Sequence, residues 1–97
     1  MANVSVIGAG SFGTSLAVLL HRNGHQVTVW ARNPEEISRL SKEREHKSKL
    51  PGVKLPDDMI FTSELKEAAE NKDFIVFAVP STAVRNVARN IRPFIKD

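Results

Sequence analysis

The spacing of hydrophobic residues along the chain switches between a strand pattern and a helix pattern. Residues 3–8 form a short apolar run that ends in glycine, which predicts a strand. Residues 11–22 carry apolar side chains at helical spacing, which predicts a helix with one apolar face made of Phe12, Leu16, Leu19 and Leu20. Gly24 is a typical helix stop, and residues 26–31 predict a second strand.

The segment after the second strand carries unusually complete signals for the start of a helix. Asn33 is a good N-cap, Pro34 suits the first helical position, and the next two residues are acidic, which favours the positive end of the helix dipole. Residues 42–58 follow, with mixed charges, two Leu-Pro pairs and a glycine. This composition predicts an exposed excursion between two regular elements.

The remaining residues continue the alternation. Residues 59–62 predict a third strand, and residues 63–71 predict a helix that is capped by its first residue, Ser63. Residues 74–80 form an uninterrupted apolar run, which favours a central parallel strand covered on both faces. From about Thr82 the helical spacing returns on four apolar residues: Val84, Val87, Ala88 and Ile91.

Strands and helices therefore alternate along the whole chain. This order predicts the α/β class, with a doubly wound parallel sheet and helices on both faces. Right-handed crossovers give the strand order 3-2-1-4, so the first and fourth strands lie side by side. In such sheets ligands bind in the crevice at the carboxyl ends of these two strands.

A glycine motif of the form G-x-G-x-x-G lies directly after the first strand and opens the first helix, as in a Rossmann-like fold. Gly8 permits a tight turn, Gly10 leaves room for a pyrophosphate, and Gly13 lets the helix approach the sheet. The free N–H groups at Ser11 and Phe12, where the helix begins, suit an anion. This motif, in this context, predicts a dinucleotide site, with a purely structural glycine turn as the alternative.

The end of the second strand bears on which dinucleotide is bound. Sites for NAD usually place an acidic residue about 20 positions after the glycines to receive the ribose hydroxyls. This chain has Ala31 and Arg32 there, and an arginine can pair with a 2′-phosphate. The sequence thus favours NADP(H), or tolerance of both NADP(H) and NAD(H), with a solvated surface arginine as the alternative. Glu35 and Glu36 could in principle reach a ribose, but stabilisation of the helix dipole is the favoured interpretation.

Pro80 ends the fourth strand opposite the glycine loop, where the backbone can lie along the nicotinamide side of a cofactor. A plain strand terminator is the alternative. No catalytic constellation and no metal-ligand cluster is found in the sequence, so we expect neither catalytic nor metal-binding residues. A nicotinamide supplies the hydride itself, and the protein must orient it and provide a proton donor. We expect this segment to provide only the orientation.

Composition narrows the possible partners. The chain has 97 residues, 41% of them hydrophobic and 26% charged, which suits one globular domain. The net charge of +3 is spread along the chain without interleaved aromatic residues, which argues against nucleic acid. Cysteine is absent, and the three histidines, His21, His25 and His46, are interpreted as surface residues. The apolar run at 74–79 is far shorter than the roughly 20 residues of a membrane span, and we expect a cytoplasmic protein.

Three segments together resemble the N-terminal domain of the bacterial type of NAD(P)-dependent glycerol-3-phosphate dehydrogenase: VIGAGSFGTSLAVLLHRNGHQVTVWARNPE, LPGVKLPDDMIFTSEL and DFIVFAVPS. The motifs LPGVKLP and AVPS are the most particular to that family. The resemblance implies reversible reduction of dihydroxyacetone phosphate to sn-glycerol 3-phosphate, for glycerophospholipid synthesis. It also implies cofactor contacts at Ser11, Phe12, Arg32 and Asn33. Lys49 stands where members of the family commonly carry tyrosine.

The resemblance further implies that residues 1–97 are an incomplete NAD(P)-binding domain. The catalytic lysines of the family and its helical substrate domain would follow, and a small phosphorylated substrate would bind only with that second domain. The chain alone is then expected to be inactive, and a homo-oligomer is compatible with it. Two alternatives stay open: a stand-alone NAD(P)-sensing regulatory module, and a related dehydrogenase such as a pyrroline-carboxylate or ketopantoate reductase.

Overall fold

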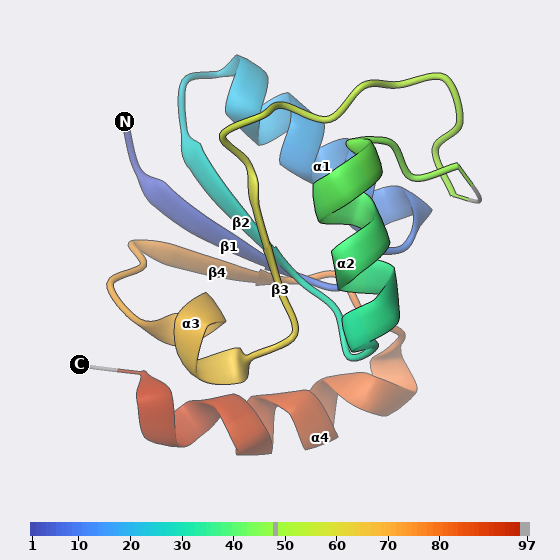
Figure 1. The fold of residues 1–97 in the computed structure, drawn as a ribbon. Helices are drawn as coiled ribbons and strands as arrows, with labels where there is room; N and C mark the ends of the chain where they lie inside the picture. Colours follow the sequence, from blue (N-terminus) through green and yellow to red (C-terminus); the bar gives the residue numbers. More distant parts are fainter. Residues whose placement is uncertain (48, 96–97) are drawn as a thin grey trace.

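A computed structural model of the chain describes residues 1–47 and 49–95 and shows a parallel four-stranded sheet (Figure 1). The strands are β1 (Asn3–Ile7), β2 (Gln26–Trp30), β3 (Ile60–Thr62) and β4 (Phe74–Phe77). Their order is β3-β2-β1-β4, and in register Val6 of β1 lies between Val29 and Val76. The predicted α/β class and the strand order 3-2-1-4 are confirmed.

Two layers of helices enclose the sheet, as predicted (Figure 1). The helices are α1 (Ser11–Arg22), α2 (Pro34–Glu43), α3 (Leu65–Ala69) and α4 (Ser81–Ile91), and a 3-10 turn at Arg92–Phe94 follows α4. Helices α1 and α2 pack with Val6, Val27 and Val29 in one apolar cluster. Helices α3 and α4 pack with Ile7 and Trp30 in a second cluster on the other face.

Helix α1 has the predicted length, but the face that packs on the sheet is only partly the one predicted. Phe12 and Leu19 are 68% and 55% exposed. The buried side of the helix consists of small or β-branched residues: Gly13, Thr14, Ala17 and Val18. The close approach of this helix to the glycine loop selects small side chains there. Leu20 packs, partly buried, against the apolar cluster, whereas Phe12 and Leu19 stay outside it.

The segment 42–58 is largely exposed, as its composition predicts, but two of its residues are buried. Leu55 is completely buried in the apolar cluster beneath α1 and α2, and His46 is only 4% exposed. A tight turn fixes this part of the chain, because the Leu50 N–H donates to the His46 carbonyl at 2.7 Å. The prediction that His46 is a surface residue is therefore wrong: the excursion folds back and covers it.

Arg44 fastens the second half of this excursion to the body of the domain. It ends α2 in the left-handed conformation, with φ at 55°. Its Nη1 donates to the carbonyls of Pro56 at 3.0 Å and Met59 at 2.6 Å, and its guanidinium lies 5.3 Å from the centre of the Phe61 ring. Hydrogen bonds from an ionised donor are roughly twice as strong as neutral ones. The excursion is thus held through its main chain.

Two elements in the second half differ from the prediction. Helix α3 begins at Leu65 and not at Ser63, because the Glu64 N–H donates to Thr62 Oγ1 at 3.0 Å and delays the first turn. Strand β4 lies at an edge of the described sheet, and Phe74 is 62% exposed. The apolar run of β4 therefore does not make it a central strand covered on both faces within this chain.

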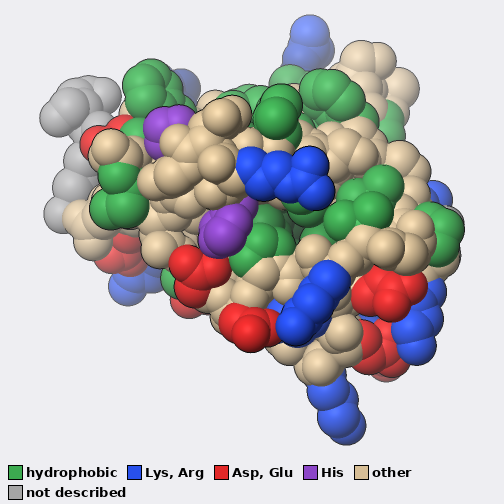
Figure 2. Space-filling view, turned by 90° about the horizontal axis from the view of Figure 1, so that it is seen from above, with side chains coloured by type: hydrophobic (Ala, Val, Ile, Leu, Met, Phe, Trp, Pro, Cys, Tyr) green, Lys and Arg blue, Asp and Glu red, His purple; other side chains and the backbone are tan. Residues whose placement is uncertain are grey.

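Charged side chains of both signs are interspersed on the face of the domain shown in Figure 2. One pair joins the end of α1 to the segment before β3, with His21 Nε2 2.8 Å from Asp58 Oδ1. This hydrogen bond is the main reason that the pKa of the Asp58 carboxyl lies below its usual range. None of the helices in residues 1–47 and 49–95 is long and apolar enough to cross a membrane.

Candidate dinucleotide-binding site

A cavity of about 400 Å³ opens at the carboxyl ends of β1 and β4. Gly8 and Gly10 line it on one side, and Ala78, Val79 and Pro80 line it on the other. These two segments lie about 70 residues apart in the sequence, and the order of the strands brings them together. The cavity therefore lies at the topological switch point, where the sequence predicts the ligand.

Gly8 and Gly13 shape the loop by packing. Gly8 has φ at +127°, and a Cβ on it would lie 2.6 Å from the Ala78 carbonyl oxygen. Its N–H donates to the Trp30 carbonyl at 2.8 Å, which ties the loop to the end of β2. A Cβ on Gly13 would overlap the Gly8 carbonyl oxygen. Both glycines allow backbone to approach backbone, in agreement with the roles predicted for them.

Gly10 is different, because it lines the cavity and a Cβ on it would meet no atom within 4 Å. Its backbone is extended, with φ at −74° and ψ at −172°. A side chain at this position would thus be compatible with the domain but would project into open space beside the loop. That space is where the sequence predicts a pyrophosphate.

Helix α1 begins at this cavity, with Gly10 as its N-cap. Twelve residues long, it presents its free N–H groups and its partial positive charge at this end. The Ser11 Oγ donates to the Lys49 carbonyl at 3.0 Å, which joins the glycine loop to the excursion. Neither Ser11 nor the exposed Phe12 is among the residues that line the cavity.

The end of β2 forms another wall. Trp30 and Ala31 are buried and line the cavity, and the exposed Arg32 lines it as well. Asn33 is not a lining residue, and its Oδ1 accepts the Glu35 N–H at 2.9 Å as the predicted N-cap of α2. Of the predicted contacts, the cavity lining thus brings together Gly8, Gly10, Arg32 and Pro80, and it leaves Ser11, Phe12, Gly13 and Asn33 beside it.

Two charged lining residues, Glu36 and Lys49, were not predicted as part of the site. Glu36 lies in the first turn of α2 and Arg32 precedes the N-cap Asn33, and both line the cavity. The sequence allows Glu36 to reach a ribose, although a role in the helix dipole is the favoured interpretation. Lys49 comes from the excursion, and no local pattern indicates that this segment folds back to the glycine loop.

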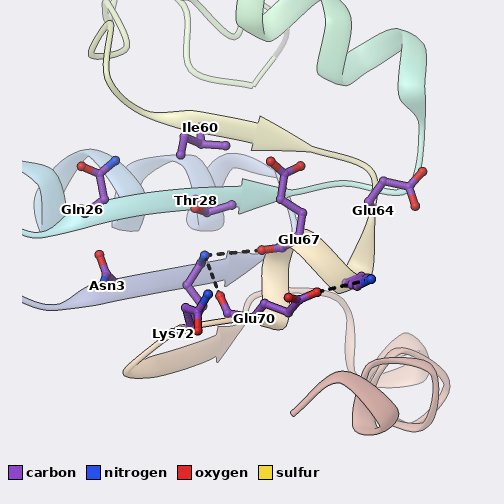
Figure 3. Close-up of a pocket in the computed structure, with 10 residues that line it drawn as sticks. Asn3, Gln26, Thr28, Ile60, Glu64, Glu67, Glu70 and Lys72 are labelled. Atoms are coloured by element: carbon purple, nitrogen blue, oxygen red, sulfur yellow. Dashed lines mark hydrogen bonds and ion pairs between the residues drawn. The ribbon is translucent and has the colours of Figure 1, made fainter. Parts of the chain in front are cut away.

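A larger hollow of about 640 Å³ lies at the opposite, amino end of the strands (Figure 3). Its floor includes Thr28 and Ile60, and residues on and beside α3 form its rim. Lys72 Nζ donates there to the carbonyls of Glu67 and Glu70, at 3.4 and 3.2 Å. Ligands of doubly wound sheets bind at the carboxyl ends of the strands, so this hollow is not the predicted site.

The parallel sheet, the glycine loop that opens α1 and the cavity beside it define a Rossmann-like dinucleotide-binding domain. Within the described residues, no group of three or more His, Cys, Asp or Glu is placed to hold a metal ion. Residues 3–97 match the family described as the N-terminus of NAD-dependent glycerol-3-phosphate dehydrogenase. The chain belongs to this family. A nicotinamide dinucleotide as cofactor class is thereby confirmed.

Individual relatives agree with this assignment. The chain is 47% identical over all of its 97 residues to the glycerol-3-phosphate dehydrogenase, NAD(P)+, of Fusobacterium nucleatum, of which it covers 29%. It is equally similar to one of these enzymes from Lactobacillus delbrueckii, of which it covers 28%. The chain thus spans less than a third of the length of the curated relatives it matches.

Solved structures show the same fold. The glycerol-3-phosphate dehydrogenase of Coxiella burnetii superposes with a TM-score of 0.92 at 29% identity, over 99% of this chain and 30% of that one. A 2-dehydropantoate 2-reductase, assigned as putative, from Enterococcus faecalis superposes at 0.69 with 19% identity, over 97% of this chain and 30% of that one. That second likeness concerns the fold alone.

Proposed function

We propose that this chain is the cofactor-binding part of an oxidoreductase that interconverts dihydroxyacetone phosphate and sn-glycerol 3-phosphate with NAD(P)H. The observation that carries the proposal is the cavity in which the glycine loop meets the end of β4. Family membership and 47% identity to enzymes named for this reaction support the choice of substrate over that of a related dehydrogenase.

The described residues fit a dinucleotide along the carboxyl ends of the strands. Gly10 and the N–H groups of Ser11 and Phe12 would hold the pyrophosphate at the start of α1. Arg32, next to the N-cap Asn33, would face the adenosine end of the cofactor. The backbone at Pro80 would lie along the nicotinamide. When bound, the nicotinamide supplies the hydride, and these residues orient it.

The proposal extends to the setting of the whole protein. A small phosphorylated substrate would bind only together with a helical domain beyond these 97 residues, and the product would enter glycerophospholipid synthesis. We further propose a cytoplasmic location, with no nucleic-acid partner and with self-association of the whole protein. Mixed surface charge on the face in Figure 2 supports the exclusion of nucleic acid.

Titration with NADPH and with NADH tests the cofactor site directly. The chain has one tryptophan, Trp30, which lines the cavity and is 6% exposed. We expect a saturable change in its fluorescence, together with heat in calorimetry, because a bound nucleotide changes the surroundings of the indole ring. If neither NADPH nor NADH gives a saturable fluorescence change or heat of binding, the cofactor site is refuted.

Replacement of Arg32 by Ala tests the adenosine end. We expect binding of NADPH to weaken about tenfold or more, since a charged hydrogen bond contributes about 1.5–3 kcal/mol, and binding of NADH to change much less. Arg22→Ala is the control, because Arg22 is an exposed arginine at the far end of α1. Equal losses for both nucleotides would reject pairing of Arg32 with a 2′-phosphate.

A further inference from the structure

We propose that Glu36 is a specificity-determining residue of the cofactor site. Its carboxylate accepts a hydrogen bond from the 2′-hydroxyl of the adenosine ribose and opposes a 2′-phosphate at the same place. Together with Arg32, it sets the balance between NAD(H) and NADP(H). This inference rests on the proposed function, since it requires a dinucleotide in the cavity of the glycine loop.

The position of Glu36 supports this role. In dinucleotide sites of this fold the ribose is received by an acidic residue shortly after the second strand. Here Ala31 and Arg32 stand at the end of β2, and Glu36 follows in the first turn of α2. Glu36 lines the same cavity as Gly10 and Arg32. The end of β2 carries no acidic residue, but the first turn of α2 provides a carboxylate, Glu36, at the same cavity.

The excursion holds this carboxylate in place. Glu36 Oε2 lies 3.7 Å from Nε2 of the buried His46. His46 is itself fixed by the turn to Leu50, whose N–H it receives. A carboxylate can accept several hydrogen bonds, so contact with His46 at one oxygen leaves capacity for a ribose hydroxyl. The Glu36 side chain is 30% exposed, and it lines both the cavity of the glycine loop and a second hollow of about 260 Å³ that it shares with His46.

The charges of the cavity lining explain why one residue can shift the balance. Three lining residues are charged: Arg32, Lys49 and Glu36. Glu36 is thus the one carboxylate among these lining residues, and a ribose 2′-hydroxyl can donate to it whereas a 2′-phosphate at neutral pH is repelled. Arg32 has the opposite preference. The two residues therefore compete over the same group of the nucleotide.

The neighbouring Glu35 is a control that distinguishes contact with the nucleotide from stabilisation of the helix dipole. Both glutamates lie in the first turn of α2 and carry the same charge, but Glu35 is exposed and does not line the cavity. Dipole stabilisation is lost equally when either is changed to glutamine. A change in nucleotide preference that occurs only with Glu36 therefore reports contact with the nucleotide.

The experiment measures dissociation constants of NADH and NADPH for the unchanged protein, Glu36→Gln and Glu35→Gln. We expect Glu36→Gln to lower the ratio of the NADPH to the NADH constant about tenfold, equivalent to about 1.4 kcal/mol. Glu35→Gln should leave that ratio unchanged. An unchanged ratio in Glu36→Gln, or an equal shift in both variants, overturns the assignment.

A second measurement isolates the adenosine end. Adenosine 2′,5′-bisphosphate should bind Glu36→Gln more tightly than the unchanged protein, whereas AMP should not. Equal affinity of the bisphosphate for the two proteins would contradict the proposal. If the unchanged protein binds neither NADH nor NADPH, the proposed function fails and this assignment fails with it. If the unchanged protein binds the nucleotides and Glu36→Gln has the same preference between them, only the role of Glu36 is overturned.

Discussion

Replacement of Gly13 by Ala is expected to lower the free energy of unfolding by about 3 kcal/mol, the upper range for overpacking. The added Cβ would overlap the carbonyl oxygen of Gly8. That oxygen cannot move away, because the Gly8 N–H is bonded to Trp30 and Gly8 itself packs against Ala78. Urea unfolding, followed by circular dichroism, measures the loss.

The sign of this effect is diagnostic. In an unconstrained helix interior, alanine is more stable than glycine by about 1 kcal/mol. Without the contact to Gly8, the substitution would therefore stabilise the domain. Ser15→Ala is the control, because Ser15 is an exposed residue of the same helix and its replacement should alter stability only slightly. A stabilising Gly13→Ala would contradict the packing described for the glycine loop.

Gly10→Ala is expected to leave the fold intact and to weaken the binding of both nucleotides about tenfold to a hundredfold. The added methyl meets no protein atom within 4 Å, and the backbone at Gly10 suits any residue. It would occupy the space proposed for the pyrophosphate, where overpacking costs about 1–3 kcal/mol. Calorimetric titration, with unfolding measured in parallel, separates the two effects.

Gly10→Ala should also differ from Arg32→Ala and Glu36→Gln in how it changes the affinities for NADH and NADPH. The pyrophosphate is common to NADH and NADPH, so both affinities should fall together and their ratio should stay the same. Unaltered affinity for both nucleotides in Gly10→Ala would mean that the cofactor does not approach the loop at this glycine.

Elements with local signals were predictable from the sequence. Asn33 and Pro34 mark the start of α2 through short-range hydrogen bonding and a fixed φ, and the structure has the helix there. Alternation of strands and helices, together with the handedness of crossovers, was enough for the strand order. The glycine loop was predictable as well, because its glycines are needed for contacts with residues close in sequence or with a neighbouring strand.

Features that depend on distant contacts were not predictable. The buried face of α1 is set by its closeness to the glycine loop, and hydrophobic periodicity does not distinguish that face from the ridge of Phe12 and Leu19. The burial of His46 follows from the path of the excursion, which charge and proline content do not reveal. Lys49 was missed for the same reason, because it joins the cavity only after that segment folds back.

The segment 42–58 is held in place by contacts to its main chain, whereas its side chains contribute to the wall of the cavity. Arg44 bonds to the carbonyls of Pro56 and Met59, so many side chains between 45 and 58 can change without loosening the segment. This segment nevertheless supplies Lys49 to the cavity wall and His46 to the back of Glu36. A substitution at Lys49 or His46 would therefore change the wall of the proposed nucleotide site without touching the sheet or its glycine turn.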